Sequence, residues 1–247
     1  MKESARTCLC CFGLLALLLL GCGNLSAQDP SSPALIRILE DAEKKYGPEP
    51  GLVNGQRYYY PYRNVLGNPY LEREGPESSC AVCMNGRTYR QLTLRYDVYN
   101  QLLILELPDR HGATLQIVLP GNLVEEFTLG EAHFRRLPGP GGEELFAQVL
   151  GEGRVTLLAF WSKYYRTDPK MGEIRHSFSN PVRRLAVSLD GQVREFKGKR
   201  GFVHCFGRDV QKGVRAMWKA SQIPLGRTSD AELAGFIESV NVYLDEN

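Results

Sequence analysis

The sequence predicts an α+β fold in which a mostly antiparallel β-sheet precedes helices. Up to residue 198, short segments alternate apolar and polar residues, as strands with one buried face do. Short polar links, several containing Asn-Gly or Asp-Gly, separate these segments and favour hairpins. Beyond that point apolar residues recur at intervals of three and four residues. This is the spacing of a helix with one buried face, and it predicts two or three helices. We therefore expect a meander, a sandwich or a half-barrel, and not a parallel α/β sheet.

The first residues have the layout of an export signal. Lys2 and Arg6 precede an apolar block at residues 12–20, which is too short for a membrane span of about 20 residues. Cleavage after Ala27 would release an unanchored chain, whereas cleavage before Cys22 would leave its thiol for lipidation. Either alternative predicts a protein of the periplasm, the cell surface or the medium, with no transmembrane span in the mature chain.

One helix is expected between the leader and the first strand. Ser32 and Pro33 suit its N-cap and first position, and residues 34–46 carry apolar side chains at helical spacing. The chain then divides into a leader (1–27, or 1–21 if lipidated), an N-terminal helix and linker (28–51), a β-rich domain (52–198) and a helical segment packed on it (199–247).

The strands are predicted from alternation and from turns. Residues 92–98, 103–107 and 115–119 form a central meander with short polar links. Asp190-Gly191 predicts a type I′ hairpin, and Thr228 or Ser229 with Glu232 marks the start of the last helix. Further strands are expected at 123–129, 133–137, 145–150 and 155–165. Loops are expected at 72–79 and from 166 to 175.

The charge balance argues against a dedicated nucleic-acid-binding protein. The chain has 30 basic and 28 acidic residues, a net charge of +2. Residues 194–219 are an exception, because eight basic residues there outnumber two acidic ones. On helices these side chains could face anionic lipid headgroups or acidic glycans, although a solvated helix face is the simpler interpretation.

Cys80 and Cys83 form a Cys-x-x-Cys pair. Such a pair can be a redox couple, half of a zinc site or a local disulfide. No thioredoxin-like unit surrounds the pair, and a zinc site would need further ligands, for which His204 and Cys205 are the candidates. Zinc is thus the one cofactor that the sequence suggests, and a structural bridge or small apolar thiols are the favoured alternative.

Four tyrosines are the candidate ligand surface. Tyr58, Tyr60, Tyr62 and Tyr70 could present apolar ring faces to a sugar or a partner protein. The simpler alternative is that alternate rings pack into the core while the others cover a sheet edge.

The sequence contains no HExxH, nucleophile-elbow, P-loop or dinucleotide motif. We therefore favour a non-catalytic protein. The alternative is an envelope hydrolase or a metal-binding protein with its site near Cys80, Cys83 and His204.

Several short motifs occur together: Asn-Gly-Gln-Arg-Tyr-Tyr-Tyr at 54–60, Gly-Asn-Pro-Tyr at 67–70, Asn-Gly-Arg-Thr-Tyr at 85–89 and Leu-Arg-Tyr-Asp-Val-Tyr-Asn-Gln-Leu at 94–102. With its leader and basic helical tail, the sequence resembles a recurring class of exported bacterial cell-envelope proteins of unassigned function. The resemblance implies export and no particular activity. We expect an envelope protein that binds a protein, a lipid or a glycan.

Overall fold

The computed structural model describes residues 52, 55–71, 75–108, 113–170, 173–223 and 228–246. All of them belong to one unit, Gly51–Asn247. The predicted leader, the lipidation candidate Cys22 and the predicted helix at residues 34–46 lie outside the described residues. None of the helices in the described part is both long and apolar enough to cross a bilayer.

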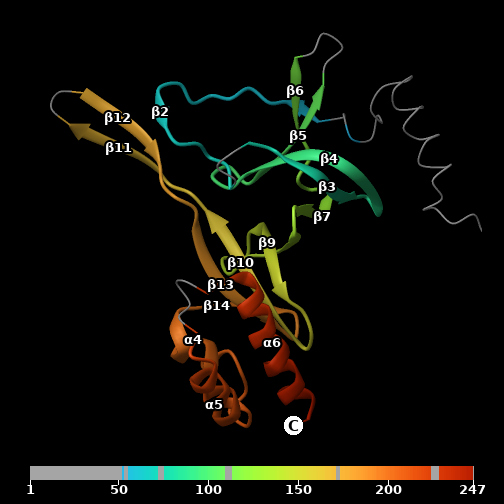
Figure 1. Cartoon of the computed structure of the whole chain (residues 1–247), viewed down its shortest axis with the longest axis vertical. Helices are drawn as coiled ribbons and strands as arrows, with labels where there is room; N and C mark the ends of the chain where they lie inside the picture. Colours follow the sequence, from blue (N-terminus) through green and yellow to red (C-terminus); the bar gives the residue numbers. More distant parts are fainter. Residues whose placement is uncertain are drawn as a thin grey trace, which may run out of the picture. The chain divides into compact units, whose positions relative to one another are not determined.

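An antiparallel sheet of eleven strands forms the body of this unit, as the alternation predicted (Figure 1). The strands are β1 (Gln56–Arg57), β3 (Glu77–Met84), β4 (Arg87–Asp97), β5 (Leu102–Pro108), β6 (Thr114–Val118), β7 (Val124–Leu129), β8 (Ala132–Pro138), β9 (Glu144–Gly151), β10 (Val155–Ser162), β13 (Val182–Leu189) and β14 (Gln192–Phe196). Their order is β1-β6-β5-β4-β3-β7-β8-β9-β10-β13-β14. Two meanders therefore grow in opposite directions from β3, one through β4 to β6 and the other through β7 to β10.

Two of the tight turns have the predicted chemistry. Asn85 and Gly86 join β3 to β4 with φ angles of 51° and 71°. Asp190 and Gly191 join β13 to β14 with φ angles of 51° and 74°, which confirms the predicted Asp-Gly hairpin. Positive φ at both central residues is what a type I′ turn requires.

The first half of the sheet is strongly curled. Tyr96 on β4 is fully buried, and its ring centroid lies 5.4 Å from Phe127, 5.5 Å from Phe134 and 6.0 Å from Phe146. Phe146 is on β9, four positions from β4 in the strand order, a distance of about 19 Å in a flat sheet. The sheet therefore rolls around its own apolar face, while β1 and β14 remain separate edges.

Three helices follow the sheet, which confirms the predicted C-terminal helices. They are α4 (Gly198–His204), α5 (Gln211–Ser221) and α6 (Asp230–Asp245). Phe202, Trp218 and Phe236, one from each helix, pack together against one face of β10, β13 and β14. Ser229 is the N-cap of α6, and its side chain and that of Glu232 form the predicted capping box.

A second sheet departs from the prediction. It consists of β11 (Tyr165–Lys170), β12 (Glu173–Phe178) and β2 (Val65–Leu66), in the order β11-β12-β2. The expected loop from residue 166 to 175 is thus a hairpin, and the strand expected at 155–165 ends at Ser162. In Figure 1 this hairpin extends beyond the ends of β10 and β13. We call these three strands the small sheet.

Candidate functional site

Aromatic side chains from three separate segments meet at the base of the small sheet. Tyr62 lies at the centre, with its ring centroid 4.8 Å from Phe178, 6.0 Å from Tyr165 and 6.2 Å from Tyr99. Tyr60 contacts the other side of Tyr62 at 5.5 Å. We define the aromatic cluster as Tyr58, Tyr60, Tyr62, Tyr70, Tyr99, Tyr165 and Phe178.

The structure brings together the four tyrosines that the sequence singled out. The hydroxyl of Tyr70 lies 3.5 Å from that of Tyr58, and the rings of Tyr60 and Tyr70 are 6.2 Å apart. Tyr70 is buried, whereas Tyr60 is exposed, so packing and surface roles are divided among the rings. Desolvation by burial raises the pKa of all four phenols above the ordinary tyrosine value. They are therefore neutral hydrogen-bonding groups at physiological pH.

A buried carboxylate holds the turn that carries Tyr99. Asp97 accepts hydrogen bonds from the backbone N–H groups of Tyr99 (3.0 Å) and Asn100 (2.8 Å) and from the Asn100 side chain (2.8 Å). The same amide group also donates to the hydroxyl of Tyr62 at 3.0 Å. The turn and the central ring of the cluster are thus fixed by one polar network.

A buried lysine fixes the segment that carries Tyr70. Lys163, in the link between β10 and β11, donates from Nζ to the carbonyl oxygen of Asn68 at 2.9 Å and to its Oδ1 at 3.1 Å. That Oδ1 also accepts from the backbone N–H of Tyr70 at 3.1 Å. The segment that bears Tyr70 is therefore tied to the base of the small sheet.

The titration of Asp97 gives a testable pH dependence. Burial raises the pKa of this carboxyl above its ordinary value of 3.8, although the bonds from Asn100 and the charge of Lys163 oppose the shift. Between the pKa of Asp97 in the unfolded chain and its raised pKa in the folded protein, the folded protein keeps a proton that the unfolded chain has released. The free energy of unfolding therefore falls as pH rises through this range. Asp97→Asn removes the titration.

Urea unfolding of the parent and of Asp97→Asn between about pH 4 and pH 8 tests this expectation. The parent should lose stability relative to the variant as pH rises above the ordinary aspartate value, and the difference should be constant above the raised pKa. Parallel curves across the whole range would contradict the assignment.

The small sheet has one apolar and one charged face. The cross-strand pairs put Tyr165, Thr167, Pro169, Ile174, His176 and Phe178 on one face, and Arg166, Asp168 and Arg175 on the other. The apolar face is buried at its base, where Phe178 packs against Tyr62 within the aromatic cluster. It becomes exposed toward the tip, where Ile174 is 68% exposed. An apolar face thus continues from the core into solvent.

Exposed large hydrophobic side chains concentrate in the same region. Among the described residues eight are exposed, and seven lie in the segments around the small sheet and the aromatic cluster: Tyr59, Tyr60, Leu66, Tyr99, Tyr164, Ile174 and Val182. The eighth, Val242, lies on α6. Single exposed apolar residues are common on protein surfaces, so it is their number in these segments that makes the region the candidate site. We call this region, together with the aromatic cluster, the aromatic surface.

The candidate ligands for a disulfide or a metal are not brought together. Cys80 is buried in the core beneath the curled sheet, whereas Cys83 lies on the other face of β3 with its thiol 3.5 Å from Glu125. Cys205 is buried beneath the helices, and His204 is exposed.

No disulfide joins Cys80, Cys83 and Cys205 to one another, and the described residues contain no group of three or more potential metal ligands. Desolvation raises the pKa of Cys205, and together with Glu125 it also raises that of Cys83. Both thiols are therefore protonated at neutral pH and are poor nucleophiles.

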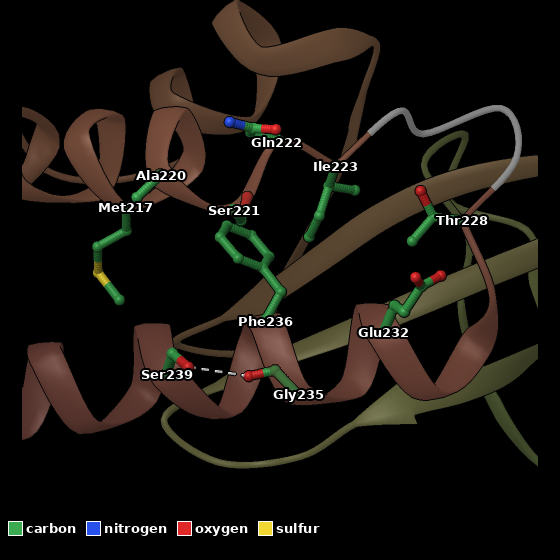
Figure 2. Close-up of a pocket in the computed structure, with 10 residues that line it drawn as sticks. All are labelled: Met217, Ala220, Ser221, Gln222, Ile223, Thr228, Glu232, Gly235, Phe236 and Ser239. Atoms are coloured by element: carbon green, nitrogen blue, oxygen red, sulfur yellow. Dashed lines mark hydrogen bonds between the residues drawn. The ribbon is translucent and has the colours of Figure 1, made fainter.

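A groove of about 580 Å³ lies between α5 and α6, away from the aromatic surface (Figure 2). Met217, Ile223 and Phe236 supply its apolar wall. Two of its hydroxyl groups bond to the helices themselves: that of Ser221 donates to the carbonyl of Trp218 at 2.9 Å, and that of Ser239 donates to the carbonyl of Gly235 at 3.0 Å. The Glu232 carboxylate belongs to the N-cap of α6. The hydroxyls of Ser221 and Ser239 and the carboxylate of Glu232 are therefore bonded within or next to the helices that carry them.

No protein-family model matches this chain. No curated protein and no solved structure matches it either. The function is therefore argued from the geometry of the described residues. Sequence reasoning missed Tyr99, Tyr165, Ile174 and Phe178. The alternation of residues 165–169 and 174–178 was the signal that could have placed Tyr165, Ile174 and Phe178 on one face.

Proposed function

We propose that this chain is an exported, non-catalytic protein of the cell envelope that binds a partner protein through the aromatic surface. The observation that carries the proposal is the concentration there of seven of the eight exposed large hydrophobic side chains of the described residues. The export part rests on the leader-like start of the sequence, which suits a periplasmic or surface location with or without a lipid tether at Cys22.

The chemistry of the surface favours a protein over a glycan or a lipid. Leu66, Ile174 and Val182 add branched aliphatic side chains to the aromatic ones. Many rings meet edge to face, and the guanidinium of Arg57 lies 5.3 Å from the ring centroid of Tyr59, the most exposed tyrosine. Tyrosine and arginine are enriched in the cores of protein interfaces. Stacking on a sugar needs an uncovered flat ring face.

The hydrolase and metal-binding alternatives gain no supporting observation. Both would need Cys80, Cys83 and His204 to converge. Cys80 and Cys83 lie on opposite faces of β3, and His204 is exposed on α4. A nucleophilic role would also need a thiolate, which the raised pKa of Cys83 disfavours.

Site-specific photo-crosslinking in the producing cells tests the proposal. A photoreactive phenylalanine analogue at Tyr99 or Ile174 should give discrete light-dependent protein adducts. The same analogue at Val242, exposed but away from the aromatic surface, is the matched control and should give none. A diffuse ladder that glycosidases collapse would indicate a glycan, and equal adducts at all three positions would contradict the proposal.

A charge at the tip of the small sheet should abolish binding without unfolding the protein. Ile174 is exposed, so Ile174→Asp should change the free energy of unfolding by no more than about 0.5 kcal/mol. Because an uncompensated charge in an apolar interface core is costly, the adduct formed from Tyr99 should be lost in this variant. Val242→Asp is the control and should leave the adduct intact.

A further inference from the structure

The stretch from β14 to the end of α5 carries a charge of opposite sign to the rest of the chain. Residues 194–219 contain eight basic and two acidic residues, a net charge of +6, so the remaining residues together carry −4. Neither α4 nor α5 contains an aspartate or a glutamate. A solvated helix face usually mixes both signs, which makes this segregation informative.

The basic residues of α5 form one exposed stripe. Lys212, Arg215 and Lys219 are spaced by three and four residues, so they lie on one face of the helix. All three are exposed, whereas Val214 and Trp218 of the same helix are buried against the core.

No acidic side chain of the described residues pairs with the stripe. Within the described part of the chain, Lys212, Arg215 and Lys219 take part in no ion pair. Like charges at these spacings destabilise a helix. The small residues Ala216 and Ala220 are exposed beside the stripe, so no bulky side chain at these two positions shields the three cations. An external anionic surface would compensate the repulsion.

We infer that this stripe binds the anionic headgroups of phospholipids, and that α5 lies along the membrane surface while the aromatic surface holds the partner protein. Lipid is favoured because the three cations are exposed along one side of a helix, with small alanines beside them, an arrangement that suits an extended anionic surface. The inference rests on the envelope location proposed above. It is separable from partner binding, because its test uses purified protein and residues of α5 alone.

Sedimentation of the purified full chain with vesicles tests the inference. Binding to phosphatidylcholine vesicles that contain phosphatidylglycerol should exceed binding to pure phosphatidylcholine, which also corrects for any lipid tether. Raising salt from about 0.1 M to 1 M shortens the screening length from about 10 Å to 3 Å and should abolish the difference.

Matched charge variants locate the contact. Arg215→Gln with Lys219→Gln should weaken binding to anionic vesicles about 25-fold, since each cation near such a surface contributes about a fivefold effect. Arg87→Gln with Arg90→Gln removes the same charge from exposed positions on β4 and should have little effect. Equal weakening by both pairs would overturn the inference, as would binding to polyglutamate or to single-stranded DNA that matches or exceeds binding to the vesicles. Thermal unfolding of each variant confirms that the fold is retained.

Discussion

Replacing Tyr96 with alanine should lower the free energy of unfolding by about 4 kcal/mol, the range found for large aromatic side chains removed from a core. The ring is fully buried and contacts Phe127, Phe134 and Phe146, which come from three different strands. Closely packed rings on three strands limit how far the core can close over the lost ring. Urea unfolding followed by tryptophan fluorescence measures the change.

Tyr96→Phe separates the ring from its hydroxyl. The hydroxyl donates to Oε1 of Gln101 at 2.6 Å, and Nε2 of Gln101 bonds to the carbonyl of Val98 at 2.9 Å. Phenylalanine keeps the ring contacts, so the loss should be only about 1 kcal/mol. If alanine and phenylalanine destabilised the protein equally, the hydroxyl network and not the curled core would hold the sheet.

Asn241→Ala should cost about 3 kcal/mol. This buried side chain links α6 to the start of β10: Oδ1 accepts from the N–H of Val155 at 2.7 Å, and Nδ2 donates to the carbonyls of Val155 and Glu152 at 3.0 and 3.3 Å. Alanine leaves a buried donor and two acceptors without this partner, at about 1–3 kcal/mol for each buried group that stays unpaired.

The matched control for Asn241 is Ser239→Ala on the same helix. Ser239 is exposed and bonds only within α6, to the carbonyl of Gly235, so the change should stay within about 0.5 kcal/mol. Amide hydrogen exchange gives a local measurement, and Val155 should exchange faster in Asn241→Ala alone. Unchanged protection of Val155 would show that water replaces the asparagine.

Local patterns predicted the elements whose structure is determined by nearby residues. Asp190-Gly191 and the alternation on both sides of it defined a hairpin, and Ser229 with Glu232 marked the start of the last helix. The central meander followed from its short links. In each case the signal lies within a few residues of the turn or cap that it specifies.

Longer-range features did not follow from local patterns. Charged residues at 166, 168 and 175 indicated a loop, yet they alternate with the apolar residues of β11 and β12 and share one face. The loop expected at 72–79 becomes a strand from Glu77 onward because β4 and β7 pair on both sides of β3. The curl and the meeting of Tyr62 with Tyr99 and Phe178 depend on contacts between distant segments, which no single segment encodes.

The origin of both meanders at β3 has a consequence for biosynthesis. When the chain emerges from the ribosome, β4 can pair with one edge of β3 as soon as it has been translated. Strand β5 then pairs with β4, and β6 pairs with β5. The opposite border must wait until β7 (Val124–Leu129) has been translated. A nascent chain paused in this interval presents an uncapped row of amide and carbonyl groups. A chaperone that shields that row should therefore improve the yield of folded protein more than one that acts on the late helices.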